Sequence, residues 1–204
     1  MSTRKAESMI ETLVAITVIV ISTISALSLM RTAISGNRVI EDKVIAINLA
    51  IEGLDAIKNM RDTNYLRFSE NADECWDKIN ASVGDTCTSA QTMTPGASYF
   101  LTRNFSTEPF LEWNLTTVTD PEVDGNLDLY NIDFDRDEQI DTTIYAQAGI
   151  SSPGFVTVDE ARFKRIITFE SLPMDALQIT ATVSWDNGGV IKEISLTRVI
   201  ANVY

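Results

Sequence analysis

Hydrophobic residues follow two different patterns along the first sixty residues. From Thr12 to Met30 the chain has nineteen consecutive residues without a charge, and about twenty apolar residues allow a helix to cross a membrane. Beyond Met30, apolar residues continue at three- and four-residue spacing to Met60, with charged residues between them. This spacing is typical of an amphipathic helix. The pattern predicts a helix from about Ser8 to Arg61, membrane-embedded in its first half and amphipathic in its second.

The helical pattern has two weak points and a definite end. Gly36 and Gly53 lie within it, and each glycine destabilises a helix by about 1 kcal/mol relative to alanine. Two helices separated near Gly36 are the alternative. From 62 to 94 the helical spacing disappears, and Asn, Asp, Ser, Thr and Gly dominate. This composition predicts a connecting loop, with a short helix around 75–81.

Alternating apolar and polar residues after Pro95 predict antiparallel strands. The pattern is clearest in 177–185 and 190–199, which are joined by the run Asp186-Asn187-Gly188-Gly189, and such a run predicts a hairpin. A sheet needs one face covered, and the amphipathic half of the helix is available to cover it. The predicted fold class is therefore α+β, a long N-terminal helix packed on a C-terminal antiparallel sheet. The other predicted strands are 99–103, 111–118, 142–146 and 162–170.

Composition narrows the classes of function. The chain has 204 residues, no histidine and a formal net charge of −13. Nucleic-acid binding is not expected, because the few Lys and Arg residues form no cluster that could follow a phosphate backbone. Without histidine, Ser-His-Asp and Cys-His sites and mixed Cys/His zinc sites are excluded. We therefore expect no catalytic activity.

The charges at the N-terminus and the two cysteines indicate the compartment. Arg4 and Lys5 precede the apolar run, and positive charge remains on the cytoplasmic side of a membrane. The rest of the chain is then expected outside the cytoplasm, as a single-pass protein; a cleaved secretory signal is the alternative. An even pair of cysteines in an exported chain suggests a disulfide between Cys75 and Cys87. Two free thiols in a reducing compartment are the alternative.

Glu11 is the unusual residue of the apolar segment. It lies at the beginning of the uncharged run, where an ionised carboxylate is unfavourable unless a positive group pairs with it. A functional role in pairing is one interpretation. The other is that the side chain extends to the lipid headgroups.

The run KAESMIETLVAI, residues 5–16, resembles the prepilin peptidase motif of the type IV pilin and pseudopilin superfamily. In that motif a short basic leader precedes a cut, and a glutamate follows five residues after it. The resemblance places Ala6 before the cut, makes Glu7 the new N-terminus and identifies Glu11 as the assembly glutamate. Ala6 stands where the family usually has glycine, and Glu7 where it usually has an aromatic residue. The order of basic leader, long helix, cysteine-bearing loop and C-terminal sheet is similar to the family as well.

The resemblance implies a division of the chain and a function. Residues 1–6 would be the leader, 7–30 the transmembrane and assembly half of the helix, 31–62 its amphipathic half, and 63–204 a β-rich domain with the cysteine loop. The chain would be a structural subunit, a minor pilin or a pseudopilin. It would move from the inner membrane into a surface pilus or a periplasmic pseudopilus. Its partners would be other pilin-like subunits, membrane lipid, a prepilin peptidase, an inner-membrane platform and a motor ATPase.

The resemblance also gives Glu11 a partner. A cut after Ala6 would create an α-amine with a reference pKa near 8. In a bundle of staggered parallel helices, the amine of one subunit could meet the Glu11 carboxylate of another. Each charge is costly alone in an apolar core and much less so as a pair. The small residues of the helix permit close helix approach; they are Ala15, Ser22, Ser25, Ala26 and Ser28.

Acidic residues are concentrated between 120 and 141. Carboxylates at alternate positions suit calcium, which makes it the one candidate cofactor, with Asp133, Asp135, Asp137 and Asp141 as candidate ligands. The run lacks the glycine and the final glutamate of an EF-hand, and a solvated acidic loop is the alternative. A monomeric, membrane-anchored binding module that uses this loop is the second functional hypothesis, and an anchored hydrolase with paired carboxylates is the third.

Overall fold

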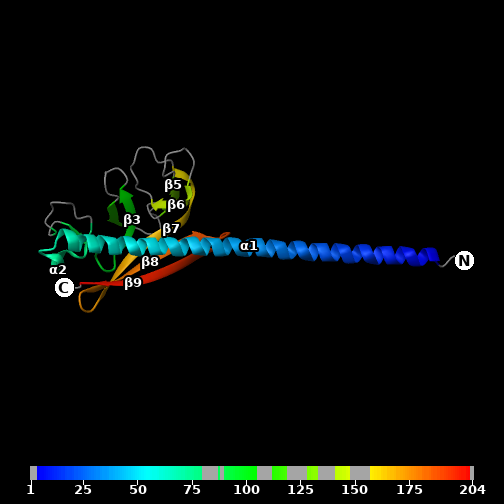
Figure 1. Ribbon diagram of the computed structural model, residues 1–204, viewed down its shortest axis with the longest axis horizontal. Helices are drawn as coiled ribbons and strands as arrows, with labels where there is room; N and C mark the ends of the chain where they lie inside the picture. Colours follow the sequence, from blue (N-terminus) through cyan, green and yellow to red (C-terminus); the bar gives the residue numbers. More distant parts are fainter. Residues whose placement is uncertain are drawn as a thin grey trace. The chain divides into compact units, whose positions relative to one another are not determined.

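The computed structural model describes residues 4–79, 87, 90–104, 112–118, 128–132, 141–147 and 157–202 (Figure 1). The chain divides into two compact units, Met1–Val44 and Ile45–Tyr204. One helix, α1 (Arg4–Arg67, 64 residues), supplies residues to both units. It runs through Gly36 without a break, and a side-chain carbon added to Gly36 would meet nothing within 4 Å. With bounds at Arg4 and Arg67, the helix starts earlier and ends later than the helix from Ser8 to Arg61 that the apolar pattern predicts.

The first unit is helical throughout its described length, and its apolar side chains are exposed from Met9 to Met30. Met9 and Leu29 are each 73% exposed, and Val20, the least exposed large apolar residue of the run, is still 49% exposed. The helix is long and apolar enough to cross a membrane. Such a surface is unfavourable in water, and together with the span length this indicates a single-pass membrane anchor.

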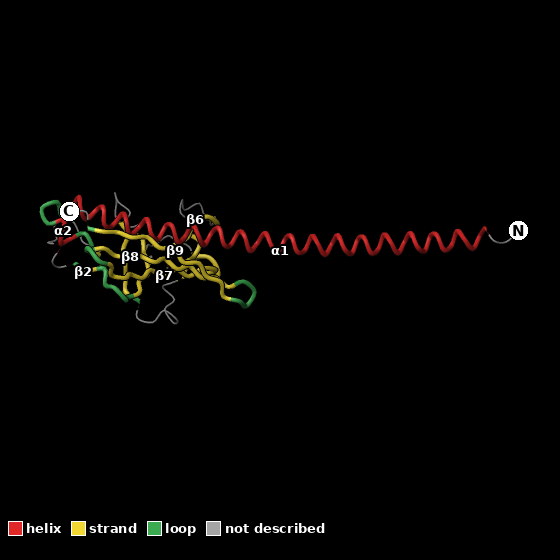
Figure 2. The backbone as a smooth tube through the Cα atoms, turned by 90° about the horizontal axis from the view of Figure 1, so that it is seen from below, coloured by secondary structure: helices red, strands yellow, loops and turns green. Residues whose placement is uncertain are grey.

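The second unit contains the last part of α1 and an antiparallel sheet (Figure 2). Five strands are hydrogen-bonded to one another in the order β4-β3-β7-β5-β6. In the same sheet, β8 pairs with β7 and with β9. The strands are β3 (Ser98–Asn104), β4 (Glu112–Thr117), β5 (Asp128–Ile132), β6 (Asp141–Gln147), β7 (Thr157–Leu172), β8 (Ala176–Asp186) and β9 (Ile191–Ala201). This arrangement confirms the coarse α+β prediction, a long N-terminal helix packed on an antiparallel sheet.

The core of the second unit lies between α1 and one face of the sheet. Side chains of β8 alternate strictly between buried and partly exposed, as the sequence pattern predicts. The buried positions face the helix, which contributes small and branched residues such as Ala46, Ala50 and Ile57, all fully buried. Figure 2 shows this part of α1 lying along the sheet. The amphipathic half of the helix thus covers one face of the sheet.

The hairpin between β8 and β9 is confirmed. Asp186 is paired with Ile191, and the turn between them has Gly188 at φ 68° and Gly189 at φ 86°. Glycine adopts such backbone angles readily because it has no side-chain carbon. The backbone N–H of Gly189 also donates to Asp186 Oδ1 at 2.7 Å, which fixes the turn.

A smaller region follows α1. It contains α2 (Ala72–Cys75) and a two-stranded antiparallel sheet of β1 (Lys78–Ile79) and β2 (Gln91–Thr92). The short helix predicted around 75–81 is therefore displaced toward the N-terminus. Pairing of Lys78 with Thr92 takes the following residues into an extended conformation instead.

Candidate functional site

The residues singled out at the N-terminus all lie on α1. The helix begins at Arg4, so the peptide bond between Ala6 and Glu7 belongs to helical backbone, while the side chains of these two residues lie outside the description. Glu11 is exposed, as are its apolar neighbours Ile10 (65%) and Leu13 (64%). Within the described part of this single chain, Glu11 has no ion-pair partner.

Most hydroxyl groups of the apolar helix donate hydrogen bonds inside the helix. Thr17 donates to Val14 O at 2.8 Å and Ser22 to Val18 O at 2.7 Å. Thr12, Thr23, Ser25 and Thr32 likewise donate to carbonyls three or four residues earlier. An unsatisfied polar group is expensive in hydrocarbon, and these hydroxyls therefore present no such cost. Glu11 is the only charged residue between 9 and 30.

In the second unit, an ion pair between a buried arginine and a partly exposed glutamate joins the sheet to α1. Arg165 on β7 is 1% exposed, and its Nη1 donates to Glu52 Oε2 at 2.9 Å and to the Leu49 carbonyl at 3.0 Å. Burial lowers the pKa of Arg165 below its usual range, and the Glu52 carboxylate opposes that shift. Since Glu52 and Leu49 belong to α1, the guanidinium joins the helix to the centre of the sheet.

Gly53 permits the close approach that this pair needs. A side-chain carbon at this position would lie 3.0 Å from Ile167 Cδ1 and 3.3 Å from Arg165 Cδ. Distances of 3.0–3.4 Å are tighter than nine in ten contacts of real side-chain carbons, so a larger residue would require the Ile167 and Arg165 side chains to shift by a few tenths of an ångström. Gly53, Arg165 and Glu52 therefore form one packed unit.

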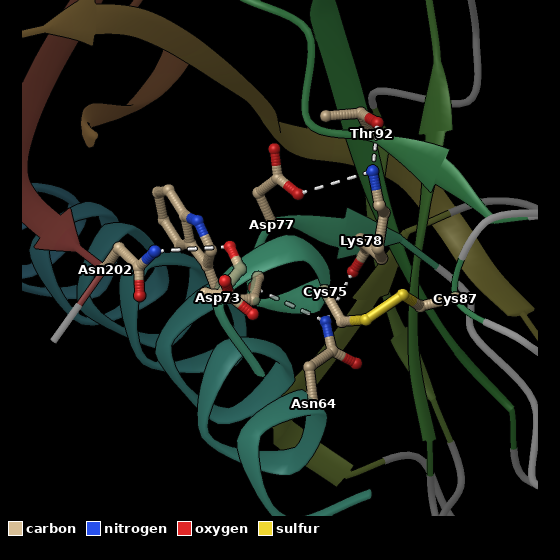
Figure 3. Close-up of a disulfide and its surroundings, with 9 residues drawn as sticks. Asn64, Asp73, Cys75, Asp77, Lys78, Cys87, Thr92 and Asn202 are labelled. Atoms are coloured by element: carbon tan, nitrogen blue, oxygen red, sulfur yellow. Dashed lines mark hydrogen bonds and ion pairs between the residues drawn. A yellow bond between two sulfur atoms is a disulfide. The ribbon is translucent and has the colours of Figure 1, made fainter. Parts of the chain in front are cut away.

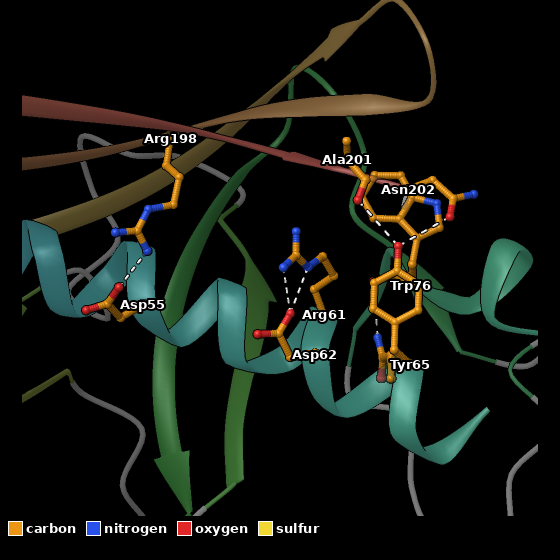
Figure 4. A network of polar contacts seen from close by, with 9 residues as sticks. Asp55, Arg61, Asp62, Tyr65, Trp76, Arg198, Ala201 and Asn202 are labelled. Carbon is orange, nitrogen blue, oxygen red and sulfur yellow. Dashed lines mark hydrogen bonds and ion pairs between the residues drawn. The ribbon is translucent and has the colours of Figure 1, made fainter. Parts of the chain in front are cut away.

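Exposed contacts extend the attachment toward the end of the helix (Figure 4). Arg198 on β9 pairs with Asp55 at 2.5 Å, with both side chains more than a third exposed. Further along α1, the Tyr65 hydroxyl lies 3.3 Å from the Ala201 carbonyl and 3.2 Å from Asn202 Oδ1. Through these contacts the last strand follows the helix to its final turn.

The cysteines form a disulfide at the end of the helix (Figure 3). Cys75 and Cys87 are buried, with a Cα–Cα distance of 5.6 Å. Nearby, Asn64 Nδ2 donates to the Lys78 carbonyl at 2.8 Å, so the same region is also tied to α1. Lys78 Nζ donates to Thr92 Oγ1 at 2.8 Å and lies 3.6 Å from Asp77 Oδ1. Burial raises the pKa of Asp77, and the Lys78 ammonium partly offsets this effect.

Removal of the disulfide is expected to destabilise the second unit. In the chain-entropy model, a loop of this length contributes about 3 kcal/mol by restricting the unfolded chain. We expect the double variant Cys75→Ala/Cys87→Ala to unfold at lower guanidinium concentration, with a free energy of unfolding reduced by about that amount. Tryptophan fluorescence of the chain in detergent would measure it, because Trp76 and Trp185 are buried. Equal midpoints for the variant and the oxidised wild type would contradict this role.

The predicted calcium ligands cannot be placed together. Asp133, Asp135 and Asp137 lie outside the described residues, and of Asp141 only the backbone, at the start of β6, is described. Within the described ranges, no group of three or more acidic or cysteine side chains is arranged to hold a metal ion. Calcium binding therefore stays a prediction from sequence.

The buried Arg165 was not predicted from the sequence, although a signal for it exists. In 162–170, the residues Phe163, Arg165, Ile167 and Phe169 alternate, so the arginine occupies an inward-facing position of its strand. A charged residue in that register requires a buried counter-charge. Glu52 on the amphipathic helix supplies it.

Comparison with known proteins gives no match: no family model, no curated protein and no solved structure is similar to this chain. The functional interpretation therefore rests on the residues and contacts described above.

Proposed function

We propose that this chain is a structural subunit, a minor pilin or pseudopilin, of a type IV pilus-like filament or related secretion pseudopilus. It is processed after Ala6 and assembled through its N-terminal helix. The observation that carries the proposal is Glu11, an exposed carboxylate near the N-terminal end of an exposed apolar helix. A mere anchor needs no charge there, and its insertion would be easier without one.

The remaining features suit the two environments that such a subunit occupies. In the membrane, an apolar helix with internally bonded hydroxyls is stable as a single span. In a filament, the same surface would be covered by the helices of other subunits, and the pairing of Glu11 with a neighbour's α-amine would set their register. The second unit, held together by the Arg165–Glu52 pair and the disulfide, would remain folded outside the cytoplasm in both places.

This role requires partners but no catalysis. A prepilin peptidase would cut the leader, and an inner-membrane platform with a motor ATPase would transfer the subunit from the lipid into the filament. The side chains of this chain would contribute packing and charge pairing. The filament would then be displayed at the cell surface or in the periplasm.

Cell fractionation tests the proposal. Filaments are sheared from cells that express the full chain at its natural level and are collected by ultracentrifugation. We expect the processed chain in this fraction, and its loss from the fraction when the motor ATPase is inactivated, because transfer out of the membrane is driven. A chain found only in the membrane fraction, with or without the motor, would contradict the proposal and favour a monomeric anchored module.

A further inference from the structure

The turn between β7 and β8 has an unusual residue at its tip. Leu172 pairs with Ala176, and between them Met174 has φ 64° and Asp175 has φ 47°. Within the described ranges, these are the two residues other than glycine with positive φ. A side-chain carbon is disfavoured in this left-handed region, where Gly, Asn and Asp are the usual residues. Asp175 fits this preference, whereas Met174 does not.

Packing does not account for Met174 either. It is 91% exposed, more than any other large apolar residue in the described part of the chain. The turn is held without its side chain, because the Asp175 carbonyl accepts a hydrogen bond from the Asn202 N–H at 3.0 Å. In addition, β7 and β8 are paired without a gap from Phe163 to Leu172. Backbone strain at an exposed residue points to a role outside folding.

The other methionines of the second unit are protected from solvent. Met60 and Met93 are 8% and 1% exposed and belong to the core. In the first unit, Met9 and Met30 lie on the apolar part of α1, which is long and apolar enough to cross a membrane. Met174 is therefore the one methionine of the second unit whose sulfur is open to water-soluble reagents.

The chain offers no thiol that would react in its place. It has two cysteines, and these form the buried disulfide between Cys75 and Cys87. Thiolates and thioethers are the side chains that climb the oxidation ladder with peroxides. With both thiols used in the disulfide, the thioether of Met174 is the most accessible sulfur of the second unit.

The chemistry available at this sulfur is oxygen transfer from a hydroperoxide. A sulfur lone pair attacks the OH oxygen of the peroxide, an S–O bond forms and the O–O bond breaks. Sulfur is oxidised by two electrons, and the peroxide is reduced to water or an alcohol, since the proton of the attacked oxygen moves to the leaving oxygen. The product is a sulfoxide, which is polar where the thioether is apolar.

We infer that Met174 is a site of reversible oxidation by hydroperoxides, at which the tip of the β7–β8 turn changes from apolar to polar while the second unit stays folded. The inference goes beyond the proposed function and does not depend on assembly of the chain. At an exposed position the sulfoxide contacts water and requires no repacking. The same group at Met60 or Met93 would place an unpaired polar oxygen in the core, which is destabilising.

Exposure also makes the change reversible. Methionine sulfoxide is reduced by two enzymes, one for each epimer at sulfur. Both must reach the side chain, and a residue at the tip of a turn is open to them. Oxidation at Met174 is therefore expected to be removed without unfolding of the chain.

Peroxide treatment of the full chain in detergent micelles tests the inference. The wild type and Met174→Leu, a volume-conserving control without sulfur at the turn, are treated with hydrogen peroxide or tert-butyl hydroperoxide. Peptide mass spectrometry follows sulfoxide formation at each methionine, and guanidinium unfolding is measured before and after treatment. Both sulfoxide reductases, with dithiothreitol as the electron donor, are then added to the oxidised wild type, and the peptide masses are measured again.

We expect sulfoxide to form at Met174 at least about tenfold faster than at Met60 and Met93. At the stage where Met174 alone of these three is oxidised, the guanidinium midpoint should be unchanged in both proteins, and the reductases should restore the original mass. Equal rates at the three methionines would overturn the inference. A midpoint lowered in the wild type but not in Met174→Leu would overturn it too, as would a sulfoxide at Met174 that the two reductases leave in place.

Discussion

Replacement of Glu11 by glutamine is expected to remove the chain from filaments while its insertion into the membrane stays unchanged. Glutamine has nearly the same size and can still form hydrogen bonds, but it cannot neutralise the α-amine of a neighbour. An ion left unpaired in an apolar environment costs about 3–5 kcal/mol. Since each 1.4 kcal/mol is a factor of ten, incorporation should fall at least about a hundredfold.

The matched control for this experiment is Glu11→Asp, which retains the charge on a shorter side chain and should retain part of the incorporation. Insertion is measured by resistance to extraction with alkaline carbonate, and incorporation by the amount of chain in sheared filaments. Insertion should be equal in all three proteins, because one polar residue at the end of the apolar run does not prevent spanning. Equal incorporation of the wild type and Glu11→Gln would rule out the pairing role.

Loss of the Glu52 carboxylate is expected to be the most destabilising charge removal in the second unit. In Glu52→Ala, the buried Arg165 guanidinium loses the carboxylate that pairs with it at 2.9 Å. Breaking a buried pair costs about 3–5 kcal/mol, and we expect about 3 kcal/mol because Glu52 itself is partly exposed. Guanidinium unfolding followed by tryptophan fluorescence measures this change.

Two further variants separate charge from packing. Asp55→Ala removes an ion pair on the same helix whose members are both partly solvated, and pairs of this kind contribute about 0–1 kcal/mol. The double variant Glu52→Leu/Arg165→Met replaces the buried pair by apolar residues, which is often neutral, so most of the stability should return. A Glu52→Ala variant no less stable than Asp55→Ala would show that the buried arginine does not depend on this carboxylate.

The sequence predicts the architecture because hydrophobic periodicity is strong in the long elements. The continuous helix, the helix-covered face of β8 and the hairpin at Gly188 and Gly189 all follow from local patterns. The end of α1 at Arg67 does not, because its last turns are polar. There, Asn64 and Tyr65 are held by the Lys78 and Ala201 carbonyls, and such long-range contacts stabilise helical residues beyond their own propensity.

The unpredicted features share a physical origin in pairing between distant segments. The strand β5 lies in a stretch rich in Asp and Asn, residues that disfavour strands, and it forms by pairing with β6 and β7. The Arg165–Glu52 pair joins residues 113 positions apart. At the N-terminus, by contrast, the functional interpretation depends on charge and apolarity alone, which are properties of the sequence.

The mass of the mature N-terminal peptide tests the central claim most directly. The chain is isolated from the cells that naturally produce it, digested, and its first peptide is sequenced by tandem mass spectrometry. The proposed function predicts a peptide that begins at Glu7 and carries one methyl group on its α-amine. An intact Met1, or a first residue beyond Ser28 as left by a secretory signal peptidase, would contradict it.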